Sequence, residues 1–82
     1  MPTDLDQRLA DQLDHARRML VDMGNQLALS HSVVADYGVA LQSVDIVGQM
    51  LGHIASVVRA EDRTAAVDRI GMCELKARLS AA

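Results

Sequence analysis

The sequence is poor in residues that cross-link, stiffen or break a small domain. Its 82 residues include one cysteine, one proline, one aromatic residue and no tryptophan. The single cysteine, Cys73, excludes an internal disulfide, which favours a reducing compartment such as the cytoplasm. The single proline is Pro2, so no proline interrupts the rest of the chain. A short chain without disulfides gains its stability from apolar packing, within one chain or between copies.

Neither charge nor hydropathy indicates a nucleic-acid-binding or membrane protein. Eight Lys and Arg against eleven Asp and Glu give a net charge of −3, which argues against a general nucleic-acid binder. No run approaches the roughly 18 uncharged apolar residues that a membrane span needs. The first residues are acidic and amphipathic, unlike a signal peptide. We therefore expect one cytoplasmic domain, residues 1–82, that binds neither nucleic acid nor membrane.

Apolar residues recur at helical spacing along most of the chain. A first set has the 4-3-4-3-4 spacing of a coiled-coil seam, and consists of Leu9, Leu13, Ala16, Leu20, Met23 and Leu27. A second set continues the rhythm in Val34, Tyr37, Leu41, Val44, Gly48, Leu51, Ala55 and Val58. No clean alternation of polar and apolar residues indicates a strand. The sequence therefore predicts an all-α fold.

Two arrangements fit these two apolar sets. Either one helix runs through both, or the chain breaks between Gly24 and Ser32 and folds back as a hairpin. Gly24 is suited to end a helix as its C′ residue, and Ser30 or Ser32 to cap the next one. The hairpin is favoured, because a single helix of that length buries its apolar stripe only against partners.

Capping residues also mark the other expected helix ends. Thr3 or Asp4 is suited to cap the first helix. The charged segment RAEDRT separates the second helix from a shorter third, which Asp62 or Thr64 is suited to start. One face of this third helix would carry Ala66, Ile70, Cys73 and Ala77, so Cys73 is predicted to be a small core residue.

The middle helix carries more apolar surface than one neighbour covers. Between residues 44 and 58, apolar side chains spread over about half of its circumference. At least two other helices are needed to bury that surface. We therefore expect a long antiparallel helical hairpin plus a shorter third helix, completed to a helical bundle by self-association, with a homodimer as the simplest oligomer.

The remaining arc of the middle helix is a narrow polar stripe. We define this polar stripe as Gln42, Asp45, Gln49, Gly52, His53 and Ser56. Solvated helix faces usually carry several Lys, Glu and Arg residues, whereas here Asp45 is the only charged residue from position 45 to 56 when His is neutral. Gly48 and Gly52 border the stripe, and each glycine inside a helix costs about 1 kcal/mol relative to alanine. Two reasons are open: close helix packing, or close approach of a partner.

The segment Asp45-Ile46-Val47-Gly48-Gln49 resembles a motif of the CheZ family of chemotaxis phosphatases. These proteins remove the phosphoryl group from the aspartate of a response regulator, and carry Asp-Leu-Thr-Gly-Gln on a long bundle helix. The chain matches that motif at Asp, Gly and Gln. The resemblance implies that Gln49 enters the active site of the receiver domain and orients the attacking water. It implies that Asp45 pairs with the receiver's active-site lysine.

Two functions are therefore expected as alternatives. In the first, the protein is an aspartyl-phosphate phosphatase, or a regulator-binding protein, acting on a receiver domain in two-component signalling. Gln49 and Asp45 would be catalytic, and the partner would also contact Gln42, Gly48, Gly52, His53 and Ser56. The chain itself would hold no metal or cofactor, because the Mg²⁺ of the reaction belongs to the partner. In the second, the protein is a non-enzymatic helical dimerisation or interaction module, in which Asp45 and Gln49 serve packing only.

Overall fold

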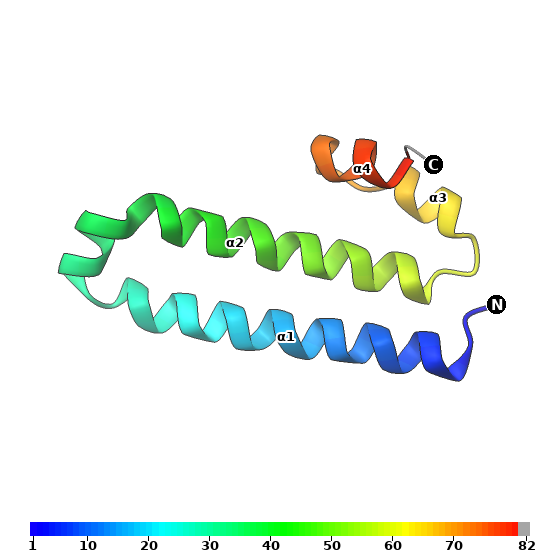
Figure 1. The fold of residues 1–82 in the computed structure, drawn as a ribbon, viewed down its shortest axis with the longest axis horizontal. Helices are drawn as coiled ribbons and strands as arrows, with labels where there is room; N and C mark the ends of the chain where they lie inside the picture. The colour runs from blue at the N-terminus through cyan, green and yellow to red at the C-terminus, as the bar shows by residue number, and fades with distance from the viewer. Residues whose placement is uncertain (81–82) are drawn as a thin grey trace.

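The fold consists of two long helices and two short ones. A computed structural model describes residues 1–80, so residues 81 and 82 of the predicted domain 1–82 lie outside the described residues. Helix α1 spans Asp4–Ala28, α2 spans His31–Arg59, α3 spans Arg63–Asp68 and α4 spans Cys73–Ser80. Figure 1 shows α1 and α2 side by side and antiparallel, with α3 and α4 beyond α2 on the side away from α1. The predicted hairpin is confirmed, and the single continuous helix was the wrong alternative.

The turn between the long helices consists of Leu29 and Ser30. Ser30 caps α2 as predicted, because its hydroxyl accepts a hydrogen bond from the N–H of Val33 at 3.4 Å. The prediction that Gly24 ends the first helix was wrong, because α1 continues through Gly24 to Ala28. Gly24 instead lies inside α1 against α2: a Cβ added there would lie 3.0 Å from Val44 Cγ1.

The start of α1 is fixed by a reciprocal pair of hydrogen bonds. The N–H of Asp6 donates to Thr3 Oγ1 at 3.0 Å, and the N–H of Thr3 donates to Asp6 Oδ2 at 3.0 Å. Arg63 Nη2 lies 2.7 Å from the same Asp6 oxygen and ties the start of α3 to that of α1. The hydrogen bond from Thr3 and the contact with Arg63 hold the pKa of Asp6 below its usual value of 3.8.

This lowered pKa predicts acid sensitivity at one residue. A carboxylate whose pKa is lower in the folded state stabilises the fold above its unfolded pKa, and loses that effect as pH falls through its folded pKa. We expect Asp6→Asn to lower the thermal midpoint at about pH 7, and the difference from wild type to shrink as pH falls through the folded pKa of Asp6. Circular dichroism at several pH values measures both midpoints. Asp4→Asn, in the same helical turn, is the control, and a difference independent of pH would contradict the prediction.

The third helix differs from the prediction, because the chain leaves the helical path after Asp68. Asp62 caps α3 as expected, its Oδ1 accepting from the N–H of Ala65 at 3.0 Å, but a separate helix, α4, starts only at Cys73. The interruption shifts the helical phase. Ile70 is buried, Cys73 is exposed and Leu75 is buried in its place, so the prediction of Cys73 as a core residue was wrong.

Two glycines differ in the space around them. A Cβ added at Gly24 would press on Val44, whereas one added at Gly38 would meet nothing within 4 Å. Gly38→Ala is therefore expected to raise the free energy of unfolding by up to about 1 kcal/mol, the usual gain inside a regular helix; the neighbouring Tyr37 departs from helical backbone angles (φ −128°, ψ 25°). Gly24→Ala is expected to gain clearly less, because Val44 must move. Urea denaturation measures both, and equal gains would show that contact with Val44 costs nothing.

The hairpin buries few side chains completely. The buried apolar residues of the described chain are Ala10, Ala55, Ile70 and Leu75, and none of its large side chains is fully buried. The seam predicted for α1 runs along the edge of the α1–α2 contact, so that Leu9 stays 49% exposed and Met23 stays 48% exposed. The contact itself passes through smaller residues, including Ala10 and Gly24.

An apolar face on α1 consequently remains uncovered. We define the apolar face as Leu5, Leu9, Met19, Met23 and Leu27, which are 63%, 49%, 61%, 48% and 39% exposed. At 3.6 residues per turn these side chains fall within an arc of about 80°, centred about 120° around α1 from the side that contacts α2. Much of the coiled-coil seam predicted for α1 therefore lies on an outer surface of the chain.

Candidate functional site

An open groove runs between α1 and α2. Its α2 wall contains every predicted site residue except Gln42, which is exposed outside the groove. The α1 wall adds Asp14, Arg17 and Val21. Apart from Gln42, the polar stripe therefore forms one wall of a surface groove whose other wall comes from the neighbouring helix.

Asp45 and Gln49 are exposed on the wall of the groove. They lie one helical turn apart, so that their side chains project to the same side of α2. Within residues 1–80 no ion pair engages the Asp45 carboxylate. A carboxylate acceptor and an amide, which both donates and accepts, are thus presented together to whatever enters the groove.

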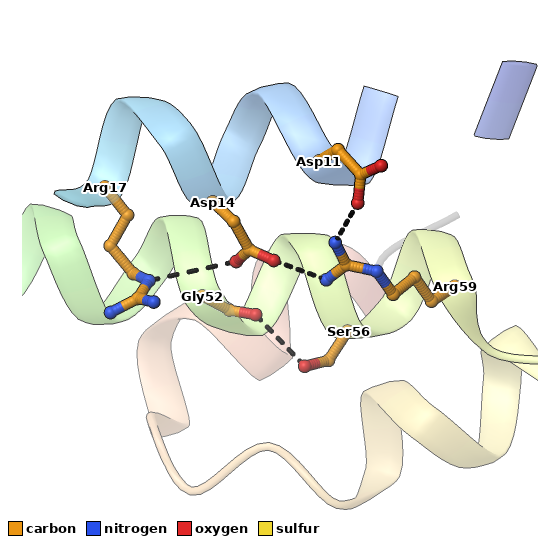
Figure 2. Close-up of polar contacts among 6 residues, drawn as sticks. All are labelled: Asp11, Asp14, Arg17, Gly52, Ser56 and Arg59. Carbon is orange, nitrogen blue, oxygen red and sulfur yellow. Dashed lines mark hydrogen bonds and ion pairs between the residues drawn. The ribbon is translucent and has the colours of Figure 1, made fainter. Parts of the chain in front are cut away.

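Arg59 closes one end of the groove with two ion pairs, shown in Figure 2. Its Nη2 lies 2.7 Å from Asp11 Oδ1, and its Nη1 lies 2.6 Å from Asp14 Oδ2. Hydrogen bonds that Arg59 donates to Asp11 and, with a smaller effect, to Asp14 hold the pKa of Arg59 above its usual range. Both edges of this guanidinium are therefore occupied by α1 carboxylates, and Arg59 fixes the register of the two helices.

Arg17 reaches into the groove across Gly52. A Cβ added at Gly52 would lie 3.4 Å from Arg17 Cδ and 3.8 Å from its Nε. The same Nε lies 3.8 Å from Asp14 Oδ1 (Figure 2). Also in Figure 2, the Ser56 hydroxyl donates to the carbonyl of Gly52 at 3.1 Å, so its proton is engaged by its own helix. Ser56 keeps only acceptor capacity for a partner.

The geometry bears on the two reasons considered for the glycines. A Cβ at Gly48 would lie 3.6 Å from Val21 Cγ2, which is an ordinary van der Waals distance. Gly52 likewise leaves room for a methyl group against Arg17. Packing inside the hairpin therefore does not require glycine at either position. Gly48 is buried and Gly52 is half-buried in the single chain, so a partner could approach closely only at Gly52.

Sequence reasoning missed the α1 wall. Asp14, Arg17 and Val21 follow one another at 3-4 spacing, on a face of α1 next to the predicted seam. That spacing was a usable signal, because it places two opposite charges beside apolar residues rather than on the outer face. Their position opposite Gly52 and Gly48 depends on the register of α1 against α2.

In comparisons with known proteins, no family model, no curated protein and no solved structure matches the chain. No helix within residues 1–80 is long and apolar enough to cross a bilayer. Nor does that part of the chain bring together three His, Cys, Asp or Glu residues that could hold a metal ion. The groups that the groove offers to a partner are the amide of Gln49, carboxylates, the imidazole of His53 and guanidinium groups.

Proposed function

We propose that the groove docks on a phosphorylated receiver domain, and that the protein acts as an aspartyl-phosphate phosphatase or regulator-binding protein. The observation that carries the proposal is the joint exposure of Asp45 and Gln49 on the groove wall. Side chains with a role only in packing within the chain would be covered by it. The resemblance of residues 45–49 to the CheZ motif gives each of the two a specific task.

The chemistry asks little of the helix that supplies these groups. Hydrolysis of an acyl phosphate is an in-line transfer to water, and catalysis consists of positioning and electrostatic stabilisation. The Gln49 amide would accept from the attacking water and fix its direction, without any change of protonation state. The Asp45 carboxylate would receive the receiver's lysine in a charge-assisted hydrogen bond. The receiver supplies the Mg²⁺ and the phosphorylated aspartate.

The remaining predicted residues would serve the approach of the partner. Gly48 and Gly52 have no side chains that would project beside Asp45 and Gln49 on the groove wall. His53, one helical turn after Gln49, offers an imidazole to an acidic or phosphorylated partner. Gln42 lies two turns from Gln49 and would meet the partner outside the groove.

The direct test measures the loss of phosphate from receiver domains of the source organism. Each receiver is phosphorylated with a small phosphodonor in Mg²⁺, the donor is removed, and the decay is followed with and without the protein. Faster decay with at least one receiver supports the phosphatase. Saturable binding to a receiver activated by beryllofluoride, with no faster decay, supports the regulator-binding form. If the protein neither accelerates decay nor binds any receiver tested, the proposal is wrong.

A second function is favoured by a different observation, the apolar face of α1. Its five side chains are all at least 39% exposed, and large apolar side chains exposed together on one helix face are typical of an interaction site. We propose that two copies pair through it, so that their hairpins complete a four-helix bundle. A second copy is the fitting occupant, because it presents an apolar helical stripe of the same length and spacing. Sedimentation equilibrium tests this: a monomer mass at every concentration would exclude pairing.

A further inference from the structure

We infer that Arg17 is an oxyanion-binding residue of the groove, and that it contacts the phosphoryl group of the receiver docked there. The inference rests on the proposed receiver-directed function, and it adds a group that the resemblance to the CheZ motif does not supply. It places the water-orienting amide on α2 and a charge-stabilising guanidinium on α1. The groove would then be a composite site, built from both helices of the hairpin.

The path of the Arg17 side chain is the first support. Arg17 starts on α1, and its Cδ passes 3.4 Å from the position that a Cβ would take at Gly52 of α2. A side chain larger than alanine at position 52 would obstruct this path. A small residue at position 52 therefore lets an α1 arginine reach the wall that carries Gln49, and glycine meets that need, although alanine would also fit.

The second support is that the Arg17 guanidinium is only weakly engaged. Its Nε lies 3.8 Å from Asp14 Oδ1, at the outer limit of an ion pair. The other Asp14 oxygen lies 2.6 Å from Arg59 Nη1, so Asp14 makes its shorter ion pair with Arg59. The Arg17 side chain remains 38% exposed. Asp14 thus orients Arg17 through Nε alone, and the other N–H groups of the guanidinium can donate to a ligand.

The chemistry of the proposed substrate fits such a group. A guanidinium presents paired N–H donors in a plane and binds phosphoryl oxygens by two parallel hydrogen bonds. Charge spreads over these oxygens in the transition state, and a positioned cation then stabilises it more than the ground state. Arginines supplied by a second protein accelerate phosphoryl transfer about 10³- to 10⁵-fold in the strongest cases. For a partly exposed arginine we expect a smaller factor, about 10-fold or more.

The test compares Arg17→Ala and Arg17→Lys with Arg18→Ala in receiver dephosphorylation. Arg18 is the matched control, because it is the adjacent arginine of the same helix, is exposed and lies outside the groove. Arg17→Lys keeps the aliphatic stem over Gly52 and the charge, but loses the paired donors. We expect both Arg17 variants to lower kcat, Arg17→Ala by about 10-fold or more, with KM changed less than about 2-fold. Arg18→Ala is expected to match wild type.

The possible failures are distinguishable. If wild type neither dephosphorylates nor binds any receiver, the proposed function fails and the inference falls with it. If wild type is active and Arg17→Ala matches Arg18→Ala, the inference alone is overturned. If the Arg17 variants raise KM and leave kcat unchanged, Arg17 contributes to docking and does not contact the phosphoryl group. Helicity measured for each variant separates a loss of folding from these results, and Arg17→Lys then decides the question if Arg17→Ala unfolds.

Discussion

Replacing Gln49 with alanine is expected to lower the rate of receiver dephosphorylation by about 100-fold or more. The reason is that the amide would be the group that fixes the direction of the attacking water, and loss of that geometry acts on the chemical step. The Gln49 side chain is exposed, so its truncation should leave the hairpin folded. Single-turnover decay of the phosphorylated receiver measures the effect directly.

Two further variants show whether that effect is specific. Gln26→Ala removes an exposed amide of α1 outside the groove, and is expected to leave the rate unchanged. Asp45→Ala is expected to weaken binding of the receiver together with the rate, because the carboxylate would hold the partner's lysine. An active wild type with an equally active Gln49→Ala variant would move the chemistry to another residue.

Introducing a carboxylate into the apolar face is expected to dissociate the dimer that we propose. Leu9→Glu and Met23→Glu each place a charge where two apolar faces would meet, and burial of an unpaired charge costs several kcal/mol. Each 1.4 kcal/mol is a tenfold change in affinity, so the dissociation constant should rise about 100-fold or more. Sedimentation equilibrium over a range of concentrations gives the constant for wild type and for each variant.

Leu29→Glu is the matched control for this experiment. Leu29 lies in the turn, outside the apolar face, and is 83% exposed in the single chain. Its replacement should leave the dissociation constant near that of wild type. Equal weakening by Leu29→Glu and Leu9→Glu would point to net charge rather than to a contact at the apolar face. A dimer that survives both Leu9→Glu and Met23→Glu must use another surface.

The helix starts could be predicted because their causes are local. Thr3, Ser30 and Asp62 each accept a hydrogen bond from an N–H three residues further on, and the sequence alone makes such caps recognisable. The prediction of a single third helix was wrong for a reason that is also local. Placing Ile70 and Cys73 on one face assumed an unbroken helix, and the break after Asp68 changed the phase.

The α2 wall of the groove was predictable, whereas the spacing of Asp14, Arg17 and Val21 marks a face of α1 without showing which α2 residues lie opposite it. Positions 45, 49 and 53 share a side of α2 because the rotation per residue within one helix is fixed. Which α1 residues face them depends on how far α1 is shifted along α2. That shift is set by contacts such as Arg59 with Asp14 and Gly24 with Val44, and no periodicity within one helix encodes it.

The ion pairs between α1 and the rest of the chain make the two ends of the hairpin different. They join Asp6 to Arg63, and Asp11 and Asp14 to Arg59, so they lie toward the chain terminus and away from the turn. A covalent link holds one end, whereas charges that salt screens hold the other. Fraying by salt or heat should therefore start at the termini and travel toward the turn. The groove would then widen from its Arg59 end first.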